Sequence, residues 1–344
     1  MIKIGRLEIG INVCPKIIAE IGINHNGSID EAKKLAELAA SSGADIIKSQ
    51  FHIPEEEMSN AAKSIIPPHT KDSIYKTINE CSLSIDEEYK FKEFIEELGT
   101  EYLCTPFSSK AAHILGDMNV KAFKIGSGEC NNHAVLEAAA SYRKPMIVST
   151  GMNTLDSCRK SYDFIKDIMG NQIILLHTTN LYPTPFHLVR LNGVRELQEI
   201  SGEYTGLSDH TTNNLASLGA VAIGAVLIER HFTDTKDREG PDIINSMTPN
   251  ELRELKENSH LMFQMRGGSK MNNLPEEDPI RDFAFATVVA TKNIQKGDHI
   301  TKSNSWPKRP GIGEIPANEH DLILGKKVNK DIAKDFHICR KDLE

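Results

Sequence analysis

The sequence predicts a (β/α)8 barrel, or TIM barrel, followed by a small C-terminal domain. Between Pro15 and Arg266, short apolar and β-branched runs alternate with longer stretches of helical periodicity. About eight such strand–helix units fit into roughly 250 residues, the usual size of this barrel. The count and the length favour the barrel over a doubly wound open sheet.

Eight segments are expected to form the barrel strands, because each is a short apolar run bounded by polar or turn residues. In chain order they are residues 16–23, 45–50, 100–106, 121–127, 145–150, 172–180, 204–210 and 225–232.

Two of the intervening helices carry start and stop signals. Ser28 is the expected N-cap of a helix that stops at Gly43, with Glu31 at the capping-box position. In a second helix the same three positions are taken by Ser84, Glu87 and Gly99.

The composition restricts the class of protein. The 344 residues include 40 basic and 48 acidic ones, a formal charge of −8, which argues against a nucleic-acid or anionic-membrane binder. No apolar run is long enough to span a membrane, and the N-terminal segment is too polar for a signal peptide, so we expect a soluble, cytoplasmic protein. The six cysteines form no C-x-x-C pair, which predicts reduced thiols.

The chain is expected to divide into a barrel at residues 1–266, a linker at 267–282 and a small domain at 283–344. The linker segment is rich in Gly, Asn, Pro and charge. The small domain contains a degenerate repeat, in which residues 294–300 resemble residues 332–338. The repeat predicts a compact fold with two pseudo-symmetric halves.

Barrel enzymes place their chemistry at the C-terminal ends of the strands. In this sequence every predicted strand ends in a residue that can bind an anion, a metal or a proton. One polar residue at a strand end means little, but a complete set indicates an active site. The residues are Glu20, Lys48, Thr105, Lys124 with Ser127, Ser149, His177 with Asn180, Asp209 with His210, and Glu229 with His231.

His210 and His231 end two consecutive strands and are therefore expected to be neighbours. Two imidazoles beside oxygen donors and open positions suit a divalent transition metal such as manganese. The alternative is that each is a hydrogen-bonded core histidine. Asp209 and Glu229 are candidates for the hydrogen bonds that fix the imidazole tautomers.

A second group combines Lys48 and Lys124 with hydroxyl side chains. Two ammonium groups and several hydroxyl donors match a phosphate, or a phosphate with a carboxylate. The alternative is that each lysine pairs with Glu20 or Glu129. Lysine inside a barrel mouth is costly unless paired, which favours an acidic ligand.

The turn at residues 180–185 contains two prolines, so its backbone is stiff and presents Tyr182 at the mouth. A rigid aromatic residue can orient a small substrate; a purely structural turn is the alternative. Phe51, His52 and the acidic run 55–57 carry no comparable signal, and the run is interpreted as a solvated face.

Motifs along the whole chain resemble the sialic acid synthase family. The C-terminal DFAFATVVA, WPKRPGIG and ILGKK resemble its antifreeze-like (SAF) domain. The GECNN motif is similar to that of bacterial N-acetylneuraminate synthases and less similar to that of legionaminate and pseudaminate synthases. The barrel motifs are EIGINHNG (20–27), IKSQFH (47–52), TPFS (105–108), FKIGSGECNN (123–132), MIVSTGMN (146–153), HTTNLYPTP (177–185), GLSDHT (206–211), and ERHFTD with GPD up to residue 242.

The resemblance implies condensation of phosphoenolpyruvate with open-chain N-acetylmannosamine, giving N-acetylneuraminate and phosphate with C–O cleavage. It also implies a divalent metal, usually manganese or magnesium, on His210 and His231. Glu20 matches the catalytic carboxylate. The phosphoenolpyruvate site is matched by Lys48, Thr105, Lys124, Ser127, Ser149 and Asn180.

The sugar site of the family is matched by Tyr182, Asp242, Phe283 and Arg309. In the family this arginine of the small domain is delivered to the barrel of the partner subunit and joins the catalytic group, which implies a domain-swapped homodimer. Supporting positions around the site are assigned to Gln50, Glu129, Asp209 and Glu229.

Two departures from the family bear on the sugar rather than on the reaction. Ser49 and Phe51 replace His and Thr of the KHQTH pattern, and Pro68-His69-Thr70 stands where close members carry Gly-Asn-Ala. Both are expected near the barrel mouth. The alternative functions are a legionaminate- or pseudaminate-type synthase, a Schiff-base aldolase using Lys48 or Lys124, and a carbohydrate- or ice-binding protein.

Overall fold

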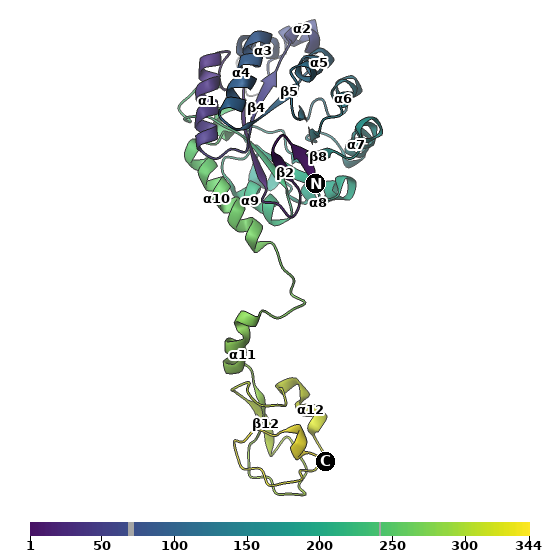
Figure 1. Ribbon diagram of the computed structural model, residues 1–344, viewed down its shortest axis with the longest axis vertical. Helices are drawn as coiled ribbons and strands as arrows, with labels where there is room; N and C mark the ends of the chain where they lie inside the picture. The colour runs from purple at the N-terminus through teal and green to yellow at the C-terminus, as the bar shows by residue number, and fades with distance from the viewer. Residues whose placement is uncertain (68–71, 241) are drawn as a thin grey trace. The chain divides into compact units, whose positions relative to one another are not determined.

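The computed structural model describes residues 1–67, 72–240 and 242–344, and it divides into two compact units, Met1–Gly267 and Gly268–Glu344. In the first unit, helices surround a ring of strands (Figure 1). The departure at Pro68-His69-Thr70 lies outside the described residues. None of the helices in the described part of the chain combines the length and the apolar composition that a membrane span requires.

The eight predicted strands are all present and parallel, and the (β/α)8 prediction is confirmed. Hydrogen-bonded ladders join them in the order β5-β4-β3-β10-β9-β8-β7-β6. In the described chain no ladder joins β5 to β6, but their Cα atoms approach within 8 Å, so the barrel is nearly closed. The strands are β3 Lys16–Gly22, β4 Ile46–Phe51, β5 Glu101–Pro106, β6 Phe123–Ile125, β7 Met146–Ser149, β8 Ile173–Thr178, β9 Thr205–Asp209 and β10 Leu227–His231.

Helices follow the strands and cover their outer face (Figure 1). The connection between β4 and α4 is longer than the others and holds short helices of its own, α2 Pro54–Glu57, η1 Asn60–Lys63 and α3 Ile74–Cys81. The remaining helices of the barrel are α1 Ile29–Ser41, α4 Ile85–Glu97, α5 Ser109–Asp117, α6 His133–Ala140, α7 Leu155–Met169, α8 Asn192–Ser201, α9 Leu215–Ala222 and α10 Pro249–Met265.

Both predicted N-caps are confirmed, but only one capping box is complete. The Ser84 backbone N–H donates to the Glu87 carboxylate at 2.9 Å, and the Ser84 hydroxyl accepts from the Glu87 N–H. Ser28 likewise accepts from the Glu31 N–H, at 3.3 Å. The Glu31 carboxylate instead accepts from Arg238, which reaches it from beyond β10.

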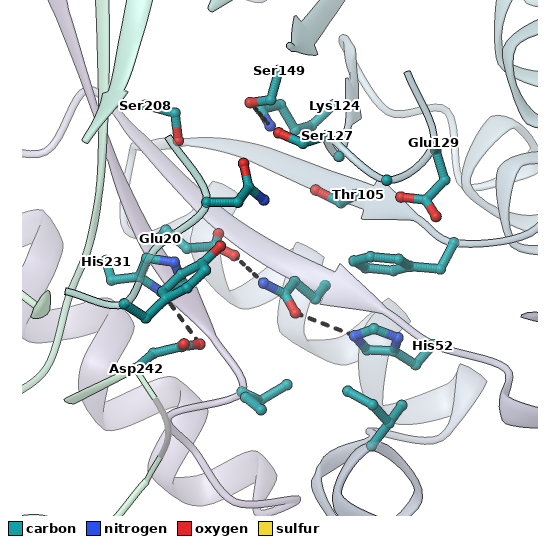
Figure 2. Close-up of a pocket in the computed structure, with 18 of the residues that line it drawn as sticks. Glu20, His52, Thr105, Lys124, Ser127, Glu129, Ser149, Ser208, His231 and Asp242 are labelled. Carbon is teal, nitrogen blue, oxygen red and sulfur yellow. Dashed lines mark hydrogen bonds and ion pairs between the residues drawn. The ribbon is translucent and has the colours of Figure 1, made fainter. Parts of the chain in front are cut away.

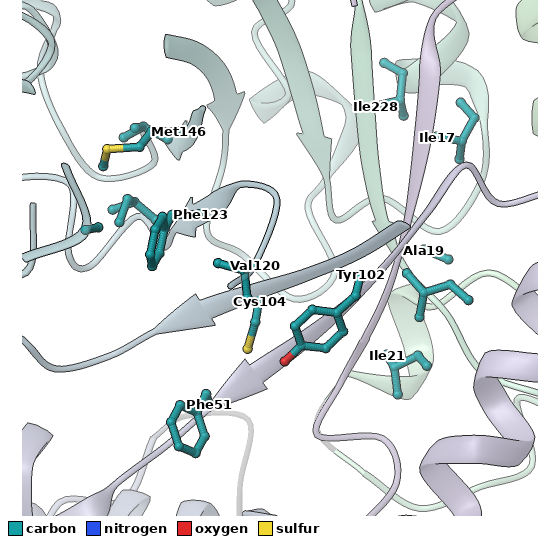
Figure 3. Close-up of a cluster of buried hydrophobic side chains, with 14 of the residues drawn as sticks. Ile17, Ala19, Ile21, Phe51, Tyr102, Cys104, Val120, Phe123, Met146 and Ile228 are labelled. Atoms are coloured by element: carbon teal, nitrogen blue, oxygen red, sulfur yellow. The ribbon is translucent and has the colours of Figure 1, made fainter. Parts of the chain in front are cut away.

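Strand alternation decides which side chains reach the inside of the barrel. On β4, Lys48 and Gln50 face the interior, whereas Ile47 and Phe51 pack in the layer between strands and helices. Figure 3 shows this layer around Phe51, Tyr102 and Phe123. Burial of each such side chain contributes about 1.5–3 kcal/mol. Ser49, fully buried on the same face as Phe51, does not line the cavity either. Both residues lie at the C-terminal end of β4, as expected, but their side chains face away from the cavity.

A hairpin that the sequence analysis did not anticipate closes the N-terminal end of the barrel. It consists of β1 Ile2–Ile4 and β2 Leu7–Ile9, paired antiparallel. Its isoleucines pack against inward-facing residues of the strands, including Ile18 and Leu103. The open space of the barrel is therefore confined to the C-terminal end of the strands.

The second unit is small and rich in loops. It contains η4 Pro275–Glu277, α11 Asp278–Ala284, β11 Thr287–Ala290, β12 Ser305–Lys308, η5 Ala317–Glu319, α12 His320–Ile323 and η6 Arg340–Asp342. The two repeated segments meet at Ile294 and Ile332, which exchange backbone hydrogen bonds of 2.9 and 2.8 Å. This reciprocal pairing is the pseudo-symmetry that the repeat predicts.

Candidate active site

A cavity of about 510 Å³ opens at the C-terminal ends of the strands. Figure 2 shows Lys124, Ser127 and Ser149 grouped apart from His231 and Asp242. Among the predicted residues, Asp209 and His177 do not line it, and Phe283 and Arg309 belong to the second unit. The predicted residues that do line it are Glu20, Lys48, Gln50, Thr105, Lys124, Ser127, Glu129, Ser149, Asn180, Tyr182, His210, Glu229, His231 and Asp242.

Two lysines and two glutamates form a buried network at the base of this cavity. The Lys48 Nζ lies 3.0 Å from Glu20 Oε2 and 3.5 Å from Glu229 Oε1, and it donates to the Thr105 hydroxyl at 3.2 Å. The Lys124 Nζ donates to Ser149 Oγ at 2.8 Å and lies 3.6 Å from Glu229 Oε1. Pairing of Lys48 with Glu20, one of the alternatives from the sequence, is therefore present.

Burial and neighbouring charge act in opposite directions on these groups. Burial lowers the pKa of Lys124 to about 8. Burial also opposes the charge of Lys48, but Glu20 and Glu229 outweigh it and raise the Lys48 pKa. For Glu229, burial is outweighed by Lys124 and Lys48, which lower its pKa to about 2. The network thus keeps cationic groups in a buried place where an anion can approach them.

The two histidines meet across adjacent strands, with ring centroids 5.5 Å apart. The His210 Nδ1 lies 2.9 Å from the Thr179 carbonyl oxygen. A carbonyl only accepts, so Nδ1 carries the proton and Nε2 remains available as a ligand. Burial and the nearby His231 lower the pKa of His210 to about 4, so the ring is neutral at neutral pH.

His231 offers a second nitrogen for a metal ion. Its Nδ1 is buried, has no hydrogen-bond partner among the residues that the structure describes, and lies 3.6 Å from Asp242 Oδ2. In the described residues, no group of three or more His, Cys, Asp or Glu side chains is arranged to hold an ion. Two imidazoles fit a divalent cation whose other positions are filled by water or substrate oxygen.

The roles predicted for Asp209 and Glu229 need correction, because neither hydrogen-bonds an imidazole. Asp209 accepts from the Thr211 N–H at 2.8 Å and from Ser217 Oγ at 2.7 Å, and it lies 3.7 Å from Arg230 Nε. Glu229 pairs with the lysines. The tautomer of His210 is set by the Thr179 backbone instead.

His177 also differs from the strand-end prediction. Its Nε2 bonds to the Val189 carbonyl at 2.8 Å, and its ring packs against Gly193, where a Cβ would lie 2.5 Å from the ring. It therefore helps to hold α8 against β8 and takes no part in the cavity.

Tyr182 lines the cavity, and its ring packs on both histidines. Its ring stacks on His210 at 4.2 Å between centroids and meets His231 edge-on at 6.0 Å. Burial raises the pKa of its hydroxyl. The ring therefore restricts both imidazoles to the orientation in which they face the cavity.

Residues 35–271 match the NeuB family, and residues 285–343 match the SAF domain. The chain belongs to the NeuB family. The small second unit is its SAF domain, as the sequence analysis expects.

Characterised relatives within the NeuB family are synthases of nonulosonic acids. The N,N′-diacetyllegionaminic acid synthase of Campylobacter jejuni is 34% identical over 327 residues, 93% of this chain and 97% of that protein. The human N-acetylneuraminate-9-phosphate synthase is 33% identical over 334 residues, 94% and 91% of the two chains. The N-acetylneuraminic acid synthetase structure from Leptospira borgpetersenii has a TM-score of 0.73 at 27% identity, over 81% of this chain and 94% of that one.

The cavity of this NeuB family member also contains two residues that were not among the predicted site residues. His52 and Glu57 line the cavity, and their side chains are only 4% and 7% exposed. Glu57 therefore does not belong to a solvated face. His52 follows Lys48 and Gln50 at alternate positions, and this spacing is the signal that could have identified it.

The far side of the cavity is formed by the connection between β4 and α4. Met58, Ile74 and Ile78 from this connection line it, together with Phe107 and Glu129. Burial and the charge of Glu57 raise the pKa of Glu129 to about 7. The cavity thus has paired lysines and glutamates at its base and apolar and acidic side chains at its far side.

Proposed function

We propose that this protein condenses phosphoenolpyruvate with open-chain N-acetylmannosamine to give N-acetylneuraminate and phosphate. The observation that carries the proposal is that one cavity holds both a lysine–hydroxyl group and a pair of imidazoles. The first suits a small dianion and the second a metal-bound carbonyl. The NeuB family relatives, which are synthases of related sugar acids, support the same reaction type.

Phosphoenolpyruvate would lie on Lys48 and Lys124. Their ammonium groups, with nearby hydroxyls and the Asn180 amide, offer donors for its phosphate and carboxylate. Such fixed binding places C3 of phosphoenolpyruvate beside the sugar aldehyde, which lowers the entropic part of the barrier. The hydroxyls are those of Thr105, Ser127 and Ser149.

His210 and His231 would hold manganese or magnesium, which supplies Lewis acidity to the aldehyde when bound. Attack of C3 on the aldehyde carbon leaves positive charge at C2. The Glu20 carboxylate, which is 1% exposed, stabilises that charge in a site largely shielded from water. Water then adds at C2, and the tetrahedral intermediate releases phosphate by cleavage of its C–O bond.

The sugar would contact Tyr182 and Asp242 in the barrel. We also propose that Phe283 and Arg309 complete this site from the SAF domain of a partner subunit, in a domain-swapped homodimer. The support is the resemblance of these positions to the family's sugar site.

Release of phosphate from phosphoenolpyruvate tests the proposal directly. N-acetylmannosamine, its 6-phosphate and diacetamido-trideoxy hexoses are compared as acceptors, and we expect turnover with the first. If another acceptor is preferred, that sugar is the substrate and the protein is a synthase of a related sugar acid. If no acceptor leads to release of phosphate, the proposed condensation is refuted. In heavy-oxygen water the released phosphate should carry no label.

A Schiff-base aldolase is the second candidate, and one observation favours it. Burial lowers the pKa of Lys124 to about 8, which makes its amine more available as a nucleophile. Borohydride reduction in the presence of pyruvate would then attach pyruvate covalently to Lys124. We expect no such adduct, because the Lys124 Nζ donates to Ser149 and faces Glu229 as an ammonium group.

A further inference from the structure

A continuous path of hydrogen bonds connects Glu57, on the long β4–α4 connection, to Glu20. Glu57 Oε1 lies 2.9 Å from His52 Nδ1, and His52 Nε2 lies 3.2 Å from Gln50 Oε1. The Gln50 Nε2 then donates to Glu20 Oε1 at 2.6 Å. Figure 2 shows the part of this path that runs from His52 to Glu20 along the wall of the cavity.

The directions of the hydrogen bonds between Glu20 and His52 follow from Lys48. The ammonium group lies 3.0 Å from Glu20 Oε2, so Glu20 is held as a carboxylate that can only accept. Gln50 must therefore turn its NH2 group toward Glu20. Its carbonyl oxygen then faces His52, which has to donate from Nε2–H.

The second ring nitrogen of His52, Nδ1, must also carry a proton. Nδ1 lies within 3.2 Å of both oxygens of Glu57, and a carboxylate there accepts a hydrogen bond. A ring that donates from both nitrogens is an imidazolium, and Glu57 supplies the compensating charge. The ring is also fixed by stacking on Phe107, with centroids 4.1 Å apart and planes at 17°.

The other titratable groups around this path are consistent with a second proton on His52. Burial lowers the pKa of the neighbouring His25 to about 4, so it adds no positive charge at neutral pH. Glu129 faces Glu57 from the loop after β6, and burial with the Glu57 charge favours its protonated form. Glu57 therefore remains the carboxylate that is paired with His52.

We propose that His52, held as an imidazolium by Glu57, is a positioning residue for Glu20 and acts through Gln50. It fixes the Gln50 amide, and the amide fixes the carboxylate that faces the reacting atoms. The part concerning Glu20 rests on the proposed function, whereas the protonation of His52 does not. The path also makes the orientation of Glu20 depend on the β4–α4 connection, which carries Glu57.

A double-mutant cycle tests whether His52 acts through Gln50. His52→Gln should lower kcat about tenfold to a hundredfold while leaving KM for phosphoenolpyruvate nearly unchanged. In a Gln50→Ala background the same substitution should cost little more, because the residue it positions is gone. If the two substitutions lower kcat independently, so that the double variant shows the product of the two factors, the proposal is overturned.

Nitrogen NMR of protein labelled in its histidines tests the protonation without any turnover. The His52 signals, assigned by their loss in His52→Gln, should show two protonated ring nitrogens near neutral pH. Glu57→Gln should convert the ring to a neutral form, since the counter-charge is removed. The control Glu56→Gln, on the same short helix but bonded to Lys110, should leave it unchanged. A neutral His52 in the unaltered protein would refute the proposal even if the synthase reaction were confirmed.

Discussion

The backbone of Gly151 lies directly against the side-chain amide of Asn180. A Cβ at residue 151 would lie 1.8 Å from Asn180 Oδ1 and 2.9 Å from Ser127 Oγ. The Gly151 N–H also donates to Ser127 Oγ at 3.0 Å. Glycine at this position lets two residues of the proposed phosphoenolpyruvate site approach each other.

Gly151→Ala should therefore weaken phosphoenolpyruvate binding, because Asn180 and Ser127 must both move away. The overpacking should also destabilise the fold by about 1–3 kcal/mol. Titration calorimetry and thermal unfolding measure the two effects. Gly10→Ala is the control, since a Cβ there would meet Glu203 and Met1 at an ordinary 3.8 Å and the residue does not line the cavity. Unchanged affinity in Gly151→Ala would contradict the placement of these two residues in the site.

Removal of either imidazole should abolish turnover and leave the barrel folded. His210 and His231 are proposed to hold the metal, and neither belongs to the apolar packing layers. Metal content, turnover and circular dichroism of His210→Ala and His231→Ala measure the result. His187→Ala serves as the control, because this histidine is exposed on the short helix η2 Phe186–Leu188 after β8. Full activity in metal-free protein would refute this assignment.

The pH profile of phosphoenolpyruvate use should reflect Lys124. Burial lowers its pKa to about 8, so the ammonium group is lost as the pH rises through that value. We expect kcat/KM for phosphoenolpyruvate to fall above about pH 8, since this ratio reports the free enzyme. Lys124→Arg keeps a positive charge and should move the fall to higher pH, although at lower activity. An identical profile in both proteins would point to another group.

The barrel and most of the cavity could be predicted from the sequence, because strand ends in a closed parallel barrel converge on one mouth. The wrong assignments concern the direction in which a side chain of a strand points. Asp209 precedes His210 by one residue, so its side chain faces outward to Arg230. Glu229 precedes His231 by two and faces inward, but toward the lysines.

The far wall of the cavity could not be predicted. Much of it comes from the β4–α4 connection, whose short helices were not among the elements predicted from the sequence. Whether Glu57 faces solvent or His52 depends on how this connection packs against the barrel. Only the structure shows that the Glu57 side chain is 7% exposed and faces His52.

Stability should decrease between acid and neutral pH because of Glu88 on α4. This carboxyl is fully buried, and Tyr102 Oη donates to it at 2.5 Å. Burial raises its pKa from 4.5 to about 7. The folded state therefore binds the proton more tightly than the unfolded state. Its stabilising contribution is complete below pH 4.5 and is lost as the pH rises through about 7.

The expected loss is on the order of 3 kcal/mol. Urea unfolding at several pH values measures it as the difference between the unaltered protein and Glu88→Gln, which cannot ionise. Glu93→Gln, exposed on the same helix, should keep the pH dependence of the unaltered protein. If the free energy of unfolding changes equally with pH in Glu88→Gln and in the unaltered protein, the prediction is contradicted.

Arg309 in the SAF domain should determine sugar use. It lies in the segment Trp306-Pro307-Lys308-Arg309-Pro310, where a proline on each side restricts the backbone. If it enters a partner's barrel as proposed, its guanidinium donates hydrogen bonds to the sugar. Arg309→Ala should then strongly raise KM for the sugar and leave phosphoenolpyruvate binding nearly unchanged. A surface arginine would contribute only about 0–1 kcal/mol through ion pairs and would not affect turnover.

Mixing two inactive variants tests whether that arginine comes from the partner subunit. A heterodimer of Arg309→Ala and His210→Ala chains can build one complete site, from the intact barrel of the first chain and the intact Arg309 of the second. Activity should therefore return in the mixture, because one of the two sites in each heterodimer is complete. Native mass spectrometry establishes that subunits have exchanged. If subunits exchange but activity does not return, Arg309 acts in the site of its own chain or in no site. In that case neither chain of the heterodimer has both an intact His210 and an intact Arg309, so no complete site can form.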